Sequence, residues 1–314
     1  MSKERAFVVQ SVGTSLVPLL KRNLARQQIL PHDASFVHAS VAAIFRWKEK
    51  EQKTLELLFI RRSVNENDTW SGQIAFPGGR RQKKTTMDMH ALDDISGEWS
   101  DWESLRETAQ RETMEEIGLD LKNEHVHWIG DLTPAQPRLS PLSVSTHVFF
   151  IDAAADEHDY NPKLQQVEIA DVFWVDVQEF FNTQRYQVLS YPLEDSFLTL
   201  RKYTRSLKLA KNILGKMSFV CIYLPRPGHY LTNEDGLSCR DVNDFVLWGL
   251  TLRAVVSIFA AAGSPLPMRS SAQRFDSYIL GNIVLYCVRY ADKVIAGTAT
   301  ISAMVLVGIA YINL

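Results

Sequence analysis

The sequence predicts an α/β (α+β) fold, and three observations support this class. Alternating apolar residues predict strands at 37–47 and 55–62, joined by a polar hairpin loop at 48–53. Charged and apolar residues at helical spacing predict a helix that ends at Gly118, and a second, apolar helix is expected at 245–262. Further strands are expected at 126–132, 144–151 and 171–175, and an amphipathic N-terminal helix at 12–28.

Composition is that of a soluble enzyme with one large domain or two. The 314 residues include 46% apolar residues, which supply ample core. The net charge of -2 gives no general attraction to nucleic acid, so no nucleic-acid partner is expected. Cys221, Cys239 and Cys287 lack metal-ligand spacing and indicate reduced thiols in a cytosolic setting. Residues 1–5 are not followed by the apolar run of a secretory signal.

Three glutamates share one face of the predicted helix before Gly118. Glu112, Glu115 and Glu116 stand at positions i, i+3 and i+4, so their carboxylates crowd one stripe. Like charges at this spacing destabilise a helix unless a cation neutralises them. A hard divalent ion is the natural candidate, and the alternative is a solvated acidic face.

The ends and sides of this helix can also be predicted. Ser100 or Asp101 is expected as the N-cap residue. Glu103, Glu107 and Arg111 form a ladder at i, i+4 spacing that is expected to support the helix surface. The buried side is expected to comprise Leu105, Ala109 and Ile117, with Met114 near its edge.

The whole stretch 97–119 resembles the Nudix box, Gly-x5-Glu-x7-Arg-Glu-U-x-Glu-Glu-x-Gly-U, in which U is a bulky apolar residue. Thr113 departs from the pattern and is expected to loosen core packing. Gly97 matches by accident, because the family glycine belongs to a Gly-Gly pair that is here Gly78 and Gly79. Residues from about 80 to 98 are then an insertion before the catalytic helix.

A second resemblance concerns the residues before the box. Segments 57–63 and 70–79 are similar to the signature of the coenzyme A diphosphatase branch of Nudix hydrolases. The Gly-x3-Phe-Pro-Gly-Gly half is kept, whereas the spacing from Ser63 to Gly72 is one residue long and Asp68 stands near an expected basic position. The opening of the late helix, 248–251, also resembles this branch.

The resemblance implies a fold and a set of site residues. The fold is a mixed sheet between α-helices, covering about residues 35–263. Glu112, Glu115 and Glu116 would bind Mg²⁺ or Mn²⁺, with Arg111 as a further catalytic residue, and Glu168 is a candidate for the loop carboxylate that assists catalysis. The substrate-binding residues would be Arg61 and Arg62, as forked phosphate donors, and Gly78 and Gly79, which allow close backbone approach. For either arginine the alternative is exposure to water.

The reaction implied is hydrolysis of coenzyme A or acyl-CoA to adenosine 3',5'-bisphosphate and a 4'-phosphopantetheine product. One alternative is a Nudix hydrolase that acts on another nucleoside diphosphate derivative, such as an oxidised nucleotide or a dinucleotide. The other is a non-catalytic membrane-bound sensor that binds a nucleotide, although the intact glutamate set speaks against it.

The remaining segments complete the predicted organisation. Residues 1–34 form a helical extension and 264–293 a linker. Residues 201–216 carry basic side chains without an acid and are expected to form a solvated face, with phosphate or anionic lipid as alternative partners.

The end of the chain is expected to anchor the protein to a membrane. Residues 294–314 are uncharged and long enough to cross about 30 Å of hydrocarbon, with Arg289 and Lys293 just before them. These two charges place the catalytic domain on the cytosolic side of an intracellular membrane. The alternative is a buried core helix, favoured by the polar and small residues Gly297, Thr298, Thr300, Ser302 and Asn313.

Overall fold

The computed structural model describes residues 15–27, 36–49, 54–65, 70–84, 101–136, 142–152, 168–192, 216–225, 245–268 and 274–275. The chain divides into two compact units. The first comprises Met1–Gln136, Pro141–Leu189 and Phe219–Ala272 and holds all the elements of the candidate site.

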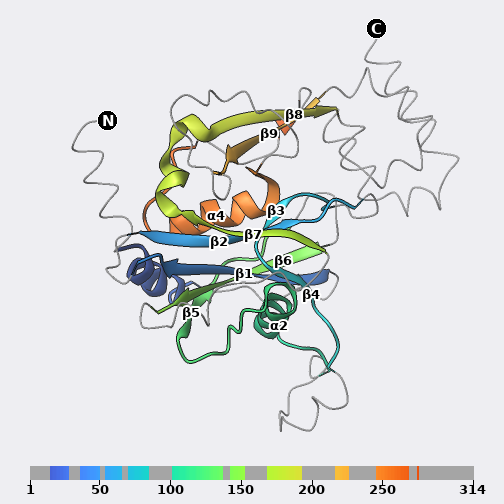
Figure 1. Ribbon diagram of the computed structural model, residues 1–314, viewed down its shortest axis with the longest axis vertical. Coiled ribbons are helices and arrows are strands. Elements are labelled where there is room, and N and C mark those ends of the chain that lie inside the picture. Colours follow the sequence, from blue (N-terminus) through green and yellow to red (C-terminus); the bar gives the residue numbers. More distant parts are fainter. Residues whose placement is uncertain are drawn as a thin grey trace, which may run out of the picture. The chain divides into compact units, whose positions relative to one another are not determined.

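A seven-stranded mixed sheet forms the centre of the first unit (Figure 1). Its strands are β1 (Val37–Trp47), β2 (Leu55–Arg62), β3 (Ile74–Ala75), β4 (Gly78–Arg80), β5 (Val126–Asp131), β6 (Leu142–Ile151) and β7 (Ile169–Asp176). Along the sheet the order is β3-β2-β1-β6-β5, while β4 also pairs with β1 and β7 with β2. The pairing of β1 with β6 is parallel, and the other pairings are antiparallel.

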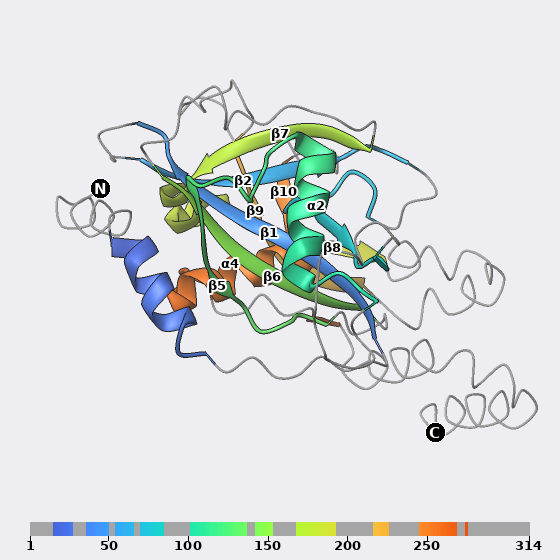
Figure 2. The ribbon, with the colours of Figure 1, turned by 90° about the horizontal axis from the view of Figure 1, so that it is seen from below.

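Two helices cover opposite faces of this sheet, α2 (Leu105–Ile117) and α4 (Gly249–Ala261), as Figure 2 shows from below. Successive residues of a strand point to opposite faces, so β1 contributes to two cores. Ala43 and Phe45 join the core that includes α4, whereas Ala42 and Ile44 join the core beneath α2. The predicted mixed sheet between helices is therefore confirmed.

Helix α2 begins later than the sequence suggested. Its N-cap is Ser104, not Ser100 or Asp101, because Ser104 and Glu107 form a reciprocal capping box. The Ser104 hydroxyl accepts from the Glu107 N–H at 3.1 Å, and the Glu107 carboxylate accepts from the Ser104 N–H at 2.6 Å. Gly118 ends the helix as predicted, with a left-handed φ of 67°.

The late apolar segment is divided between a strand and a helix. Val246–Leu247 forms β10, which pairs with β9 (Lys216–Tyr223), and α4 begins only at Gly249. A φ of 66° at Gly249 lets the chain turn out of the strand at a conformation that other residues rarely adopt. The apolar residues before the turn suit either structure, so the sequence did not separate them.

Smaller elements complete the described part of the chain. Residues 15–24 are helical and bury Leu16, Leu20 and Leu24, which confirms an amphipathic helix in this region. The remaining elements are η2 (Val177–Phe181), η3 (Thr183–Arg185), β8 (Tyr186–Pro192), which pairs with β9, and β11 (Arg274–Phe275), which also pairs with β9.

Three segments with sequence predictions lie outside the described residues. They are residues 294–314, most of the insertion at 80–98, and the basic stretch 201–215. Within the described ranges no helix combines the length and apolar character that a membrane span requires. Cys221 is a buried free thiol, and burial raises its pKa to about 12.

Candidate active site

The Gly78–Gly79 pair brings the sheet and α2 into direct contact. Gly78 pairs with Val41 and Gly79 with Ser40 across β4 and β1. A Cβ atom on Gly78 would lie 2.2 Å from the Ser40 carbonyl oxygen, and one on Gly79 would lie 2.5 Å from the carboxyl carbon of Glu112. A Cβ at Gly78 would overlap backbone atoms, and one at Gly79 would force the Glu112 side chain to move. The strand backbone therefore meets the acidic face of the helix without an intervening side chain.

Glu116 is the most deeply buried carboxylate of the stripe, with 3% of its surface exposed. Its Oε2 accepts a hydrogen bond from the Gly78 N–H at 2.9 Å. Burial raises the pKa of Glu116 to about 8, and the charges of Glu112 and Glu168 act in the same direction. Without a neighbouring cation, this carboxyl therefore holds a proton at neutral pH, and a bound cation would favour its ionised form.

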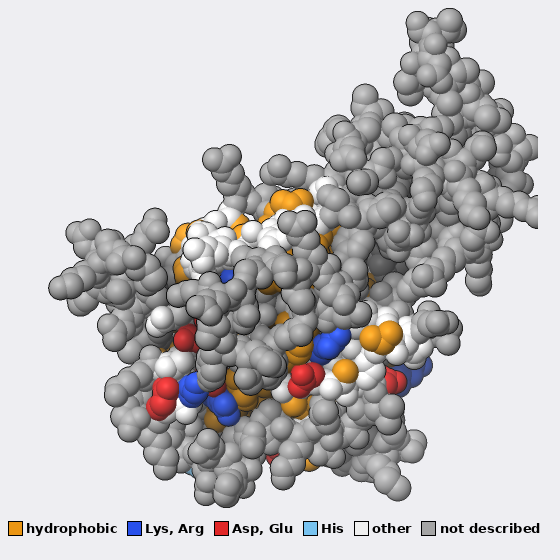
Figure 3. Space-filling model, turned by 45° about the horizontal axis from the view of Figure 1, so that its top comes forward, with side chains coloured by type: hydrophobic (Ala, Val, Ile, Leu, Met, Phe, Trp, Pro, Cys, Tyr) orange, Lys and Arg blue, Asp and Glu red, His pale blue; other side chains and the backbone are white. Residues whose placement is uncertain are grey.

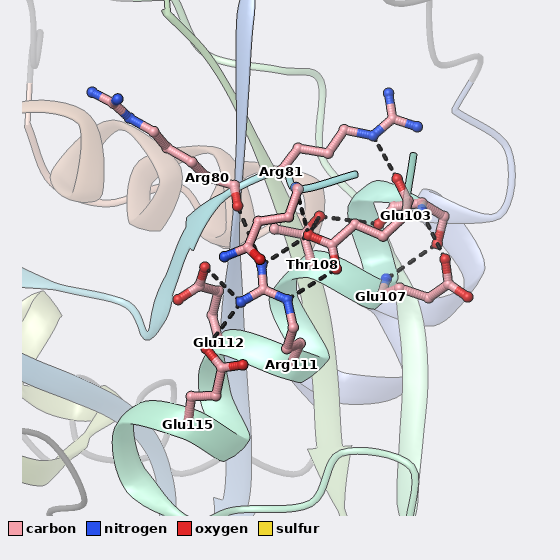
Figure 4. A network of polar contacts seen from close by, with 10 residues as sticks. Arg80, Arg81, Glu103, Glu107, Thr108, Arg111, Glu112 and Glu115 are labelled. Carbon is pink, nitrogen blue, oxygen red and sulfur yellow. Dashed lines mark hydrogen bonds and ion pairs between the residues drawn. The ribbon is translucent and has the colours of Figure 1, made fainter. Parts of the chain in front are cut away.

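Arg111 connects three carboxylates on the outer side of α2 (Figure 4). Its Nε and Nη2 contact the two carboxylate oxygens of Glu103 at 3.0 and 2.8 Å. Its Nη1 lies 3.0 Å from Glu112 and 2.9 Å from Glu115. Nη2 also donates to the carbonyl oxygen of Arg80 at 3.2 Å, which ties the helix to the last residue of β4.

The predicted Glu103–Glu107–Arg111 surface ladder is therefore wrong in its connections. Arg111 binds Glu103 in the bidentate manner and raises its own pKa by doing so, whereas Glu107 is engaged with Ser104. Burial alone would raise the pKa of Glu103, but hydrogen bonds from Arg111 and the Gln82 N–H lower it. Burial raises the pKa of Glu112 despite the attraction of Arg111.

The two arginines at the end of β2 point to different surroundings. The Arg61 guanidinium lies 5.4 Å from the ring centre of Phe245, next to the core that includes α4. The charge of Arg62 instead lowers the pKa of Glu116, so Arg62 lies on the side of the carboxylates. An irregularity in the pairing with β7 falls between these two residues. Both arginine side chains are only partly exposed, and Arg61 packs beside the core rather than in water.

Glu168 stands beside the same carboxylates. Its charge raises the pKa of Glu116, and its carbonyl oxygen accepts from the Ser63 N–H at 2.7 Å. The loop before β7 and the end of β2 are therefore joined at the edge of the site. Arg62, Glu168, Glu112 and Glu116 come from three distant parts of the sequence and converge here.

Comparison with known families agrees with this arrangement. Residues 37–193 match the family model of the NUDIX domain, which is half of the chain. This chain belongs to the Nudix family. An uncharacterized protein of Schizosaccharomyces pombe is 30% identical over 156 residues, which are 43% of this chain and 40% of that protein. The chain thus spans less than half the length of this curated relative.

Solved structures are similar to this Nudix chain at low identity. A MutT/nudix family protein from Enterococcus faecalis is 19% identical over 61% of each chain, with a TM-score of 0.30. An Ap4A hydrolase of C. elegans in a binary complex is 19% identical over 55% of this chain and 98% of its own, with a TM-score of 0.29. The NUDIX domain of Shewanella oneidensis NrtR, complexed with ADP ribose, is 16% identical over 60% and 97%, with a TM-score of 0.30. Likeness at this level says nothing about the substrate.

The Nudix glutamates have the chemistry of a divalent-cation site. Carboxylate oxygens are the ligands that Mg²⁺ and Mn²⁺ prefer. Burial is the main cause of the raised pKa values of Glu112 and Glu116, and a bound cation would favour their ionised forms. In the structure Arg111 Nη1 is the cation between Glu112 and Glu115. Within the described ranges, no three acidic, histidine or cysteine side chains lie close enough together to hold an ion. The residue types therefore fit a metal, and the ion itself stays a proposal.

Sequence reasoning missed two parts of the Nudix site. The Gly78 N–H is a direct partner of Glu116, although the glycines were expected to face a ligand. Glu103 is the principal partner of Arg111 rather than a surface support. Glu103 lies before the N-cap Ser104, outside the helix, so helical spacing did not reveal its contact with Arg111.

Proposed function

We propose that this chain is a metal-dependent Nudix hydrolase that cleaves the diphosphate of coenzyme A or of an acyl-CoA. The observation that carries the proposal is the contact between the glutamate stripe of α2 and the Gly78–Gly79 backbone. Glu116 is fixed by the Gly78 N–H, and Glu112 lies where a Cβ on Gly79 would clash with it. A fixed acidic set can hold the divalent cations that assist hydrolysis of a phosphoanhydride, and open backbone leaves room for the phosphates.

Each residue has a separate task in the proposed reaction. When bound to Glu112, Glu115 and Glu116, Mg²⁺ or Mn²⁺ supplies positive charge to the diphosphate and acidifies a water. Arg111 holds Glu112 and Glu115 on one side of the helix. Arg62 offers a guanidinium to phosphate oxygens. Glu168 stands near Glu116 and is our candidate to accept the proton of the attacking water.

The coenzyme A assignment is supported by where the signature segments lie. The end of β2 brings Arg62 to the carboxylates, and the Ser63 N–H donates to Glu168 in the loop before β7. Gly78 and Gly79 are the last residues of the second signature segment, and they lie against α2. Water adds across the P–O–P bond, and the products are adenosine 3',5'-bisphosphate and 4'-phosphopantetheine.

The full chain can be tested against coenzyme A, NADH, ADP-ribose and nucleoside triphosphates with Mg²⁺ or Mn²⁺. We expect coenzyme A to be cleaved with the highest kcat/KM, and the two named products to appear by mass spectrometry. In ¹⁸O-labelled water, one of the two new phosphates should carry the label. A tenfold or greater preference for a nucleoside triphosphate would favour the alternative hydrolase. Absence of turnover on every substrate would favour the sensor.

We also propose that residues 294–314 attach the enzyme to a membrane. The support is the uncharged composition of this segment and the two basic residues just before it, Arg289 and Lys293. On this proposal the Nudix domain faces the cytosol.

A further inference from the structure

A groove of about 440 Å³ lies between α2 and β5. Arg106 and Gln110 line it from the helix, and Val126 and Trp128 line it from the strand. At 100° per residue, Gln110 is roughly 160° around the helix from Glu112, so the groove is on another side of α2 from the acidic stripe. The groove is therefore not part of the site described above.

The groove has an aromatic wall and two exposed cations. Trp128 is 46% exposed, and the Arg106 guanidinium stacks over its ring with 4.5 Å between Cζ and the ring centre. Lys122 is the second cation of the groove and is exposed. Glu107 also lines the groove, but its carboxylate is engaged by the Ser104 N–H. Val126 and Phe149 lie at the base of the groove and are buried.

Buried polar residues fix the orientation of the Trp128 ring. Its Nε1–H donates to Asp131 Oδ1 at 2.8 Å, and the same oxygen lies 2.5 Å from His147 Nδ1. Burial would raise the pKa of Asp131, but the bonds to His147 and Trp128 lower it, so the carboxylate stays charged. The His147 side chain is 5% exposed, and its Nε2 is buried without a hydrogen-bond partner in the described part of the protein.

The Asp131 carboxylate contacts both the indole N–H and the His147 ring. Its structural effect is to fix one edge of a partly exposed indole through its N–H, while Arg106 stacks on the ring face. Such preorganisation of a surface tryptophan and arginine is useful for binding a planar ligand.

We propose that this groove binds a nucleotide, independently of the hydrolytic function proposed above. A guanidinium plane already stacked on an indole offers its other face to a base, and bases stack on both groups. Arg106 and Lys122 supply positive charge for the phosphate, and the Gln110 amide can pair with the edge of the base.

The test uses AMP as the probe and the full chain in EDTA, so that hydrolysis does not interfere. Affinity is measured by calorimetry for the wild type and for Arg106→Ala, Trp128→Ala and Lys122→Ala. Arg22→Ala, at an exposed arginine of the N-terminal helical residues, is the matched control, and Glu116→Gln tests the catalytic face. Thermal unfolding of every variant establishes that it is folded, and Trp128→Phe supplies a more conservative second variant.

We expect AMP to bind the wild type, Arg22→Ala and Glu116→Gln equally, and Arg106→Ala and Trp128→Ala at least about tenfold more weakly. Adenosine and inorganic phosphate, tested alone, should each bind more weakly than AMP. Absence of AMP binding overturns the proposal. So does binding that is lost in Glu116→Gln but kept in Arg106→Ala, because the nucleotide then occupies the catalytic face. If inorganic phosphate binds as tightly as AMP, the groove is a site for a simple anion and the nucleotide proposal is wrong. Loss of coenzyme A hydrolysis, by contrast, leaves these results unaffected.

Discussion

The buried carboxylate of Glu116 accepts a hydrogen bond from the Gly78 N–H at 2.9 Å. This bond joins the last turn of α2 to the first residue of β4, and the two residues are 38 positions apart along the chain. It holds in place a carboxyl that burial otherwise disfavours in its charged form. In a site without a cation the charged form of Glu116 is unfavourable, and a bound cation would stabilise it.

Replacing Glu116 with glutamine should remove activity while leaving the fold intact. Glutamine can still accept from the Gly78 N–H but contributes no negative charge to a metal. We expect kcat to fall at least about tenfold, because changing the residues that hold or orient a metal typically lowers activity by this much or more. In EDTA the variant should unfold at the same or a higher temperature, because the buried wild-type carboxyl stays protonated at a pH where it ionises in the unfolded chain, and glutamine carries no such cost. Wild-type turnover at saturating Mg²⁺ would show that Glu116 is not a ligand.

The stability of the metal-free protein should depend on pH through Glu116. Its pKa is raised on folding from an ordinary value near 4.5 to about 8. Folding is therefore favoured while this carboxyl is protonated, and that advantage is lost as pH rises through this interval. In denaturant titrations in EDTA, the free energy of unfolding of Glu116→Gln should increase relative to that of the wild type as pH rises from 5 to 8. This interval lies between the two pKa values. A difference that does not change with pH would contradict this.

Gly79→Ala should reduce activity more than stability. The added Cβ would lie 2.5 Å from the carboxyl carbon of Glu112, which is the far end of a flexible side chain and can move aside. We expect kcat/KM to fall at least about tenfold because Glu112 is displaced, with only a small change in melting temperature. Gly249→Ala is the control, since no atom lies within 4 Å of its Cβ position and any cost there comes from the backbone. If Gly79→Ala keeps activity within twofold of wild type, catalysis does not require the observed position of Glu112.

Glu103→Gln and Glu107→Gln should have different effects on activity, although the sequence predicted the same surface role for both residues. Glu103 binds Arg111 through both oxygens, so its neutralisation should release Arg111 and lower activity about 10- to 100-fold. Glu107 caps the helix, and glutamine can serve in the same capping box. Steady-state kinetics and thermal unfolding of Glu107→Gln should therefore resemble wild type. Equal kinetic losses in the two variants would contradict the assignment of Arg111's partner.

Removal of residues 294–314 should release the protein from the membrane. Burying about twenty largely apolar residues in lipid is favourable, so full-length protein should remain in the pellet after carbonate extraction. The truncated protein should appear in the soluble fraction with kcat nearly unchanged. Full-length protein that is extracted by carbonate, or truncated protein that fails to fold, would instead identify this segment as a core helix.

The surface of the described residues adds little to these predictions. On the face in Figure 3 basic and acidic side chains lie beside one another. This mixture agrees with the net charge of -2.

The sequence by itself determined the local parts of this protein. The i, i+3, i+4 spacing of Glu112, Glu115 and Glu116 placed three carboxylates on one helix face, and Gly118 ended that helix as expected. Such features depend on neighbours within a turn or two, which the sequence contains. The same local reasoning placed the N-cap at Ser100 or Asp101 instead of Ser104, because several polar residues there could serve.

Only the tertiary structure decided which distant residues meet. The sequence could not show that Gly78 contacts Glu116, since the strand pairing of β4 with β1 positions that backbone. It could not tell which of Arg61 and Arg62 meets the carboxylates, and the structure brings the charge of Arg62 to Glu116 while Arg61 packs near Phe245. It assigned no role to Trp128, because the link through Asp131 to His147 exists only once β5 pairs with β6. Contacts between strands are set by sheet register, which local patterns do not specify.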